Sequence, residues 1–144
     1  GLYGCVRPFH AVEPYRLEMG AKLAVDDACD LYAFWDDKLA RIIAPAGSNT
    51  TIVNLASVEY AKAVLPHLAA DATVVTCLFG EGVRNGKPIQ RSTASKKARG
   101  SMVRWMAENK LEDASGLTAF DVGYRHAPEL SNKNTLVFLN EQTL

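Results

Sequence analysis

Residues 72–79 form the segment ATVVTCLF, and residues 84–87 form the segment RNGK. The first segment is a continuous apolar and β-branched run, which is typical of a buried strand. The second contains Asn-Gly, the dipeptide that best indicates a two-residue hairpin turn, because both residues tolerate positive φ. The two segments together predict a central strand followed by a β-hairpin, with KPIQRST (87–93) as the returning strand.

Helical and extended patterns on either side of this strand indicate a mixed architecture. The other predicted elements are a packed irregular segment at 1–24, a helix capped by Asp30 that runs to about Pro45, a strand at 50–56, a helix at 58–69 capped by Ser57, a helix from about 94 to 111, a short helical turn at 111–120 and a strand at 135–140. Helices combined with a hairpin favour an α/β fold of the mixed α+β kind, with a mixed sheet, a β-hairpin and flanking helices. A chain of 144 residues without an internal repeat is predicted to form a single domain.

Positive charge is concentrated in residues 83–107, although the whole chain is neutral, with 16 Lys and Arg against 16 Asp and Glu. This stretch has no Asp or Glu, and its seven cationic residues are Arg84, Lys87, Arg91, Lys96, Lys97, Arg99 and Arg104. A helix that simply faces solvent usually has Glu within four residues of its Lys and Arg. The missing acids therefore favour a phosphate-bearing or nucleic-acid ligand over a solvated face, and such binding weakens as salt rises.

The helix predicted at 94–111 separates an apolar side from a basic side, at ~100° per residue. The apolar stripe is made by Ala94, Ala98, Met102 and Trp105, the opposite side carries Lys96, Lys97 and Arg104, and Arg99 lies at the border. We expect the stripe to face the core and the cations to face the ligand.

Two other segments contain residues suited to binding or to acid–base chemistry. The segment VRPFHAVEPYRLEMG (6–20) is stiffened by two prolines and contains Arg7, Tyr15, Arg16 and Glu18. Its alternative interpretation, slightly favoured by the residues alone, is a surface turn in which Arg and Glu neutralise each other. In NLASVEY (54–60) a strand leads into a helix, so amides near Ser57 can bind an anion. A plain N-cap explains Ser57 equally well but does not explain Asn54.

Several classes of site and partner are not indicated by the sequence. The three histidines lack the spacing of metal ligands and no glycine-rich phosphate loop is present, so neither a metal nor a cofactor is predicted. Cys5, Cys29 and Cys77 fit no disulfide framework, which favours a reducing cytoplasm. No apolar run approaches the ~20 residues of a membrane span, so no membrane partner is expected.

Five segments, in this order along the chain, resemble the bacterial YaaA peroxide-stress family. They are GLYGCVRPFHAVEPYRLEMG (1–20), LYAFW (31–35), VNLASVEYAKAV (53–64), SKKARGSMVRWM (95–106) and GYR (123–125). The first and fourth segments are long and specific, and the likeness extends to LVFL (136–139). Family members are longer, so the resemblance predicts that residues 1–144 are the C-terminal portion of a YaaA-like protein, with a partial YaaA-like fold.

The resemblance also implies a function and a set of site residues. It implies a positively charged cleft, a helix-hairpin-helix-like element with 106–124 as its candidate range, and binding of double-stranded DNA. It further implies a cytoplasmic role in protection against hydrogen peroxide, linked to limiting free intracellular iron. The residues that it places in the cleft are Arg7, Tyr15, Arg16, Glu18, Asn54, Ser57, Tyr60, Lys96, Lys97, Arg99 and Arg104.

The sequence leaves three functional hypotheses open. The leading one is a YaaA-like oxidative-stress protein that binds DNA through cations lining an open groove. The alternative is an enzyme that acts on a small anionic or nucleotide-like substrate, with Glu18 or Tyr15 as the acid or base and the basic helix holding the anion. The third is a chain without activity of its own that associates through exposed apolar surface. Convergence of Glu18, Tyr15, Asn54, Ser57 and Lys97 in one deep pocket would favour the enzyme.

Overall fold

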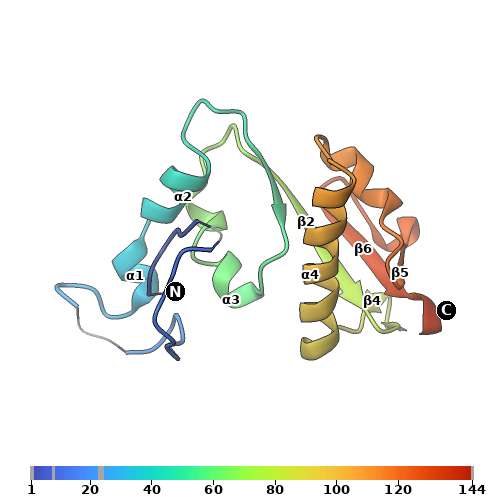
Figure 1. Ribbon diagram of the computed structural model, residues 1–144, viewed down its shortest axis with the longest axis horizontal. Helices are drawn as coiled ribbons and strands as arrows, with labels where there is room; N and C mark the ends of the chain where they lie inside the picture. Colours follow the sequence, from blue (N-terminus) through green and yellow to red (C-terminus); the bar gives the residue numbers. More distant parts are fainter. Residues whose placement is uncertain (1, 8, 23–24, 144) are drawn as a thin grey trace. The chain divides into compact units, whose positions relative to one another are not determined.

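The computed structural model describes residues 2–7, 9–22 and 25–143 and divides the chain into two compact units (Figure 1). The first unit comprises Gly1–Thr50 and Ala56–Thr73, and the second comprises Thr51–Leu55 and Val74–Leu144. Each unit has its own cluster of buried apolar side chains. Residues 1, 8, 23 and 24 of the segment predicted to be irregular, Pro8 among them, lie outside the described residues.

The second unit is built on a four-stranded mixed sheet with the order β1-β2-β6-β5, which confirms the predicted fold class. Its strands are β1 (Thr51–Asn54), β2 (Thr73–Gly80), β5 (Tyr124–His126) and β6 (Thr135–Asn140). β2 and β6 run parallel with Phe79 opposite Phe138, whereas β5 is antiparallel to β6 with Tyr124 opposite Asn140. The carboxyl ends of β2 and β6 and the amino end of β5 therefore lie at the same end of the sheet.

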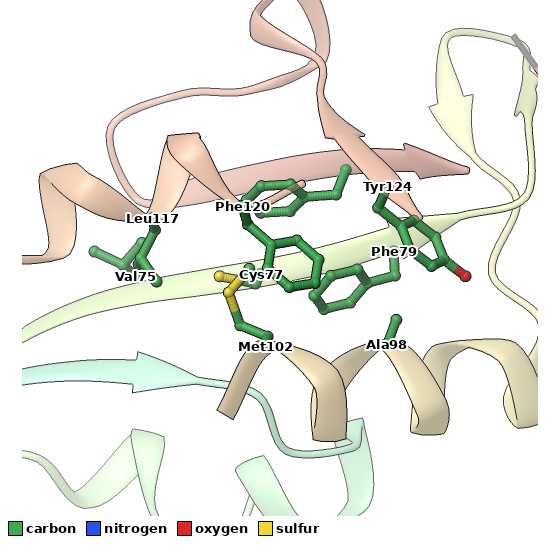
Figure 2. Packing of buried hydrophobic residues seen from close by; sticks show 9 residues of the cluster. Val75, Cys77, Phe79, Ala98, Met102, Leu117, Phe120 and Tyr124 are labelled. Atoms are coloured by element: carbon green, nitrogen blue, oxygen red, sulfur yellow. The ribbon is translucent and has the colours of Figure 1, made fainter. Parts of the chain in front are cut away.

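A long helix, α4 (Ser92–Glu108), packs on this sheet and begins two residues before its predicted start. Ala98 and Met102 of α4 are buried against Cys77 and Phe79 of β2 (Figure 2). Phe79 also stacks on Phe138 of β6, with 5.4 Å between the ring centroids. Full burial of a large apolar side chain is worth roughly 1.5–3 kcal/mol, so this cluster holds the helix to the strands.

A short hairpin, β3 (Val83–Arg84) and β4 (Lys87–Pro88), connects β2 to α4 and confirms the predicted turn. Asn85 and Gly86 have φ angles of 51° and 70°, the positive values that a type I′ turn requires. The returning strand ends at Pro88 instead of continuing to Thr93, although backbone hydrogen bonds reach one residue further, where the amide of Ile89 donates to the carbonyl of Gly82 at 2.8 Å.

The first unit consists of short helices around a buried methionine, Met19, which is fully inaccessible. The helices are α1 (Leu31–Trp35), α2 (Lys38–Ile43), α3 (Val58–Ala61) and the 3-10 helix η1 (Leu65–His67). Leu31, Leu39 and Ala63 complete the buried cluster. Asp30 caps α1 as predicted, because its carboxylate accepts a hydrogen bond from the amide of Ala33 at 2.8 Å.

Two helices predicted in the first unit are wrong in their extent. The helix predicted from Asp30 to Pro45 is divided into α1 and α2, because Asp36 has a φ of 45° and ends the first of them. The helix predicted at 58–69 ends at Ala61 and gives way to η1, where Pro66 cannot donate an α-helical hydrogen bond. Ser57 occupies the N-cap position of α3 as predicted, but its side chain makes no capping hydrogen bond.

The remaining elements lie in the second unit. The 3-10 helix η2 (Ala114–Ala119) confirms the short helical turn predicted at 111–120. The sequence pattern missed β5 and two further 3-10 helices, η3 (Pro128–Leu130) and η4 (Glu141–Thr143). The helix-hairpin-helix-like element stays a prediction. Over the residues that the structure describes, no helix has the length and apolar character that a membrane span requires.

Candidate functional site

Helix α4 presents the strongest candidate surface, and its apolar stripe lies where the periodicity predicts. Ala98 and Met102 are buried, while Trp105 is half-buried against the same cluster. Lys96 and Lys97 are exposed. Within the described part of the chain neither lysine forms an ion pair. Their charges are therefore not compensated by a direct contact with a carboxylate.

Arg104 differs from these lysines because it has an acidic partner. Its Nε donates to Glu108 Oε1 at 2.7 Å, and this hydrogen bond raises the pKa of Arg104. The acid-free stretch in the sequence ends one residue before Glu108, so sequence reasoning missed the pair. The i,i+4 spacing of Arg104 and Glu108 was the signal that could have found it. A phosphate that binds Arg104 has to compete with this carboxylate.

Arg99 is a half-buried cation with an unsatisfied donor. Its Nε is buried and has no hydrogen-bond partner among the described residues. An unpaired buried donor costs about 1–3 kcal/mol, and the lower figure applies where the rest of the group still reaches water. Because this atom is buried, an anionic ligand does not reach it in this structure, so any contact with a ligand is made by the exposed part of the side chain.

The amino end of α4 adds a pocket to this surface. Arg91, Ser92, Thr93, Ala94 and Lys97 line a pocket of about 640 Å³. The first amides of a helix have no intrahelical acceptor, so this end of α4 also attracts negative charge.

The hairpin that precedes α4 carries two more cations, Arg84 and Lys87, which are both exposed. Among the described residues neither of them, nor Arg91, forms an ion pair. We use the name basic surface for the hairpin and α4 cations other than Arg104, namely Arg84, Lys87, Arg91, Lys96, Lys97 and Arg99.

Tyr15, a candidate acid or base, has a structural role in the first unit. Its hydroxyl accepts a hydrogen bond from the amide of Leu2 at 3.1 Å, and the Tyr3 hydroxyl accepts one from the amide of Glu13 at 3.1 Å. The two tyrosine rings pack edge to face with 5.5 Å between their centroids. These contacts give Tyr15 a structural role, and whether it also acts as an acid or base stays a prediction.

The other predicted residues of the first segment point outward. Arg7, Arg16 and Glu18 are exposed, and no ion pair joins them to another described residue. The alternative interpretation of this segment, a surface turn, expects Arg and Glu to neutralise each other. No such pair is present between the described residues. Whether Glu18 acts in acid–base chemistry stays a prediction.

The second family segment is tied to the first by Glu59, which sequence reasoning did not single out. Glu59 Oε1 accepts the amide of Met19 at 2.9 Å, and the Glu59 carbonyl accepts the hydroxyl of Tyr32 at 3.0 Å. Burial and the nearby Glu59 carboxylate raise the pKa of Tyr32, so its hydroxyl stays a donor. In the same segment Ser57 is half-buried and Tyr60 is exposed. Glu59 therefore fixes the backbone between the two candidate binding residues.

Asn54 belongs to the sheet of the second unit. Its side-chain amide donates to Thr76 Oγ1 on the neighbouring strand β2 at 3.2 Å. The predicted site residues are thus distributed over both units. The first unit carries Arg7, Tyr15, Arg16, Glu18, Ser57 and Tyr60, and the second carries Asn54, Lys96, Lys97, Arg99 and Arg104. A pocket shared by both sets stays a prediction.

Metal and thiol chemistry find little support in the described residues. No group of three or more His, Cys, Asp or Glu side chains in residues 2–7, 9–22 and 25–143 could hold a metal ion. Cys77 lies in the core of the second unit, and burial raises its pKa from 9.0 to about 11. Because the thiolate is the reactive form, Cys77 is not an activated thiol at neutral pH.

Known proteins match almost the whole chain. A family model described as peroxide stress protein YaaA matches residues 1–130. UPF0246 proteins of Desulfitobacterium hafniense, Pediococcus pentosaceus and Laribacter hongkongensis are 44%, 43% and 46% identical to the chain over 140, 143 and 147 residues. The matches cover 96%, 99% and 98% of this chain but 55%, 56% and 56% of these relatives, so the chain spans about half the length of the curated relatives it matches. The family model and the relatives confirm the resemblance carried by the five segments, and the chain belongs to the YaaA peroxide stress protein family.

Proposed function

We propose that the basic surface binds double-stranded DNA, and that the protein acts in the cytoplasm in a peroxide stress response linked to limiting free iron. The observation that carries the proposal is a set of cations on one hairpin and one helix, Lys96 and Lys97 among them, that form no ion pair with another described residue. Cations that lack a carboxylate partner gain free energy when an anion pairs with them.

The chemistry of the basic surface supports a polyanion. Six cations on one hairpin and one helix can each neutralise a phosphate, with release of condensed counterions. If all six do so, the slope of log affinity against log salt reaches about −5. Phosphate contacts of this kind position a protein on the duplex without reading its sequence.

A salt titration tests this proposal. Binding of a labelled duplex is measured by fluorescence anisotropy at several salt concentrations, with this chain and with the full-length relative from Desulfitobacterium hafniense. Lys97→Gln is expected to lower the magnitude of the salt slope by about 0.9, since one phosphate contact is lost. Arg104→Gln is the matched control, because Glu108 already pairs with Arg104 in the unbound protein. A flat salt dependence, or an equal loss of slope from Arg104→Gln, would contradict the proposal.

A second candidate function, action on a small anionic or nucleotide-like substrate, is favoured by the pocket of about 640 Å³ at the amino end of α4. A pocket of this size can hold one small ligand, and it is open to solvent. Competition separates the two functions. The small-ligand function is favoured if millimolar mononucleotide or pyrophosphate displaces DNA stoichiometrically from the unsubstituted chain but does not change DNA binding by Lys97→Gln.

A further inference from the structure

A carboxylate at one end of the sheet joins three neighbouring strands of the second unit. Glu81 directly follows β2, and its Oε1 accepts the hydroxyl of Tyr124 on β5 at 2.5 Å. Its Oε2 accepts the side-chain amide of Asn140, the last residue of β6, at 3.0 Å. Tyr124 and Asn140 are opposite each other in the β5–β6 register. One side chain therefore ties the end of β2 to both strands beyond it.

The contact between Glu81 and Tyr124 is partly shielded from water. Tyr124 is 8% exposed, and its ring packs edge to face on Phe79 with 5.4 Å between the centroids. Figure 2 shows the hydroxyl of Tyr124 at the margin of this apolar cluster. Burial and the hydrogen bond to Glu81 raise the pKa of Tyr124 to about 12, so the hydroxyl remains a proton donor at neutral pH. Hydrogen bonds from a buried donor to a carboxylate are among the stronger ones in proteins.

The backbone of Glu81 closes the base of the hairpin. Its amide donates to the carbonyl of Ile89 at 2.8 Å, and the amide of Ile89 donates to the carbonyl of Gly82 at 2.8 Å. The hairpin also lies close to the strand, since a Cβ added at Gly80 would come within 2.7 Å of Pro88 Cβ. The residue that closes the hairpin is thus the same residue whose side chain is fixed to β5 and β6.

The first turn of α4 is attached to the same strand end. Ser95 is buried, and its hydroxyl donates to the carbonyl of Phe79 at 3.4 Å. The hairpin and the helix that carry the basic surface therefore share one support, the carboxyl end of β2.

We propose that Glu81 is a positioning residue for the basic surface, which holds the hairpin cations Arg84 and Lys87 in a fixed relation to the cations of α4. This inference rests on the proposed function of that surface. An isolated two-stranded hairpin is at best marginally stable in water, and β3 and β4 have two residues each. Anchoring the hairpin before binding removes the entropy cost of ordering it on the ligand.

Charge and positioning predict opposite effects of removing this acid. Glu81→Gln deletes a negative charge close to the basic surface, which by electrostatics alone strengthens binding of a polyanion. If Glu81 positions the hairpin, the same substitution weakens binding, because the amide cannot accept from both Tyr124 and Asn140. Tyr124→Phe removes the Tyr124 hydrogen bond without changing the net charge. The two substitutions therefore separate the role of the hydrogen bond from the role of the charge.

The experiment compares duplex affinity and hydrogen exchange of the full chain with those of Glu81→Gln, Tyr124→Phe and the double variant. We expect each single variant to bind about three- to tenfold more weakly with a smaller salt slope, and the double variant to be no worse than Glu81→Gln, since both remove one contact. The amides of Glu81 and Ile89 should exchange faster in each variant, while that of Met102 stays protected. Glu112→Gln is the charge-matched control, because Glu112 is an exposed acid of the second unit without a hydrogen bond to another described residue. The Glu112→Gln variant should bind DNA as tightly as the unsubstituted chain or more tightly.

Each outcome decides a separate point. Tighter binding by Glu81→Gln together with unchanged affinity of Tyr124→Phe overturns the inference, as does faster hairpin exchange without any loss of affinity. If the unsubstituted chain does not bind duplex DNA at low salt, the proposed function is wrong, and the exchange rates at Glu81 and Ile89 still decide whether the carboxylate orders the hairpin. Should Glu81→Gln fail to fold, Tyr124→Phe carries the test alone.

Discussion

Replacing Arg99 by methionine should raise stability and lower binding in the same protein. Methionine keeps the length and flexibility of the aliphatic stem but removes the guanidinium, including the buried Nε that has no partner among the described residues. Relief of one unsatisfied buried donor is worth about 1 kcal/mol at the lower end of its range, which is the appropriate figure because Arg99 is only half-buried. We therefore expect the free energy of unfolding in urea to rise by about 1 kcal/mol.

The loss of binding follows from the same group. A charge-assisted hydrogen bond to phosphate contributes about 1.5 kcal/mol or more, so affinity for duplex DNA should fall about tenfold at low salt. The magnitude of the salt slope should fall by about 0.9, since one phosphate contact is lost. Arg99→Lys adds a useful comparison, because it keeps the charge and hence most of the slope but lacks the Nε donor. An Arg99→Met chain that is less stable and binds DNA unchanged would refute the reasoning, since Arg99 would then serve packing alone.

Two further predictions concern the packing of the second unit. Gly80→Ala should lower the free energy of unfolding by about 1–3 kcal/mol, measured in urea, because its Cβ would lie 2.7 Å from Pro88 Cβ and 3.1 Å from Leu139 Cδ2. A change within experimental error would mean that the hairpin moves aside at no cost. Cys77 should resist a thiol reagent at pH 8 while Cys5 and Cys29 react, and all three should react in denaturant. Because burial raises the pKa of Cys77 from 9.0 to about 11, the unfolded thiol ionises first, so its contribution to stability is present below pH 9 and is lost between about pH 9 and pH 11. Equal labelling of all three native thiols would contradict this burial.

Elements of the second unit were predictable where the signal is local. The apolar run of β2 and the Asn-Gly turn need no knowledge of partners, because a β-branched run and two positive φ angles are properties of short segments. β5 has three residues and no alternation of its own. β5 is a strand because it pairs with β6, which is distant from it in the local pattern, and for that reason sequence patterns did not detect β5.

The first unit shows that the helical spacing of apolar residues can continue across a break between two helices. The apolar positions from Leu31 to Ile42 keep helical spacing, yet Asp36 adopts a positive φ and separates α1 from α2. The ammonium of Lys38 donates to the carbonyl of Phe34 at 2.7 Å and so satisfies one acceptor that the break exposes. A hydrophobic pattern records which side chains face the core, but it does not record whether the backbone between them is continuous.

Some features of the candidate site can be read from the sequence, and others depend on how the side chains pack. The seven cations and the missing acids of residues 83–107 are visible in the sequence alone. The sequence did not show that Arg99 would be half-buried with an orphaned Nε, because burial of a border residue depends on what packs beside the helix. For Arg104, the neutralising partner lies one residue beyond the acid-free stretch.

The anchor at Glu81 solves a conflict that any dense cationic surface creates. Arg–carboxylate pairs make strong hydrogen bonds, but each such pair would neutralise a cation that the proposed ligand would bind. Glu81 instead accepts from two neutral donors, the hydroxyl of Tyr124 and the amide of Asn140. The hairpin is thereby fixed while Arg84 and Lys87 form no ion pair within the described residues. A cation in place of Tyr124 would have to be desolvated at a buried position before it could pair with Glu81, so the neutral hydroxyl makes this hydrogen bond without the cost of burying a second charge.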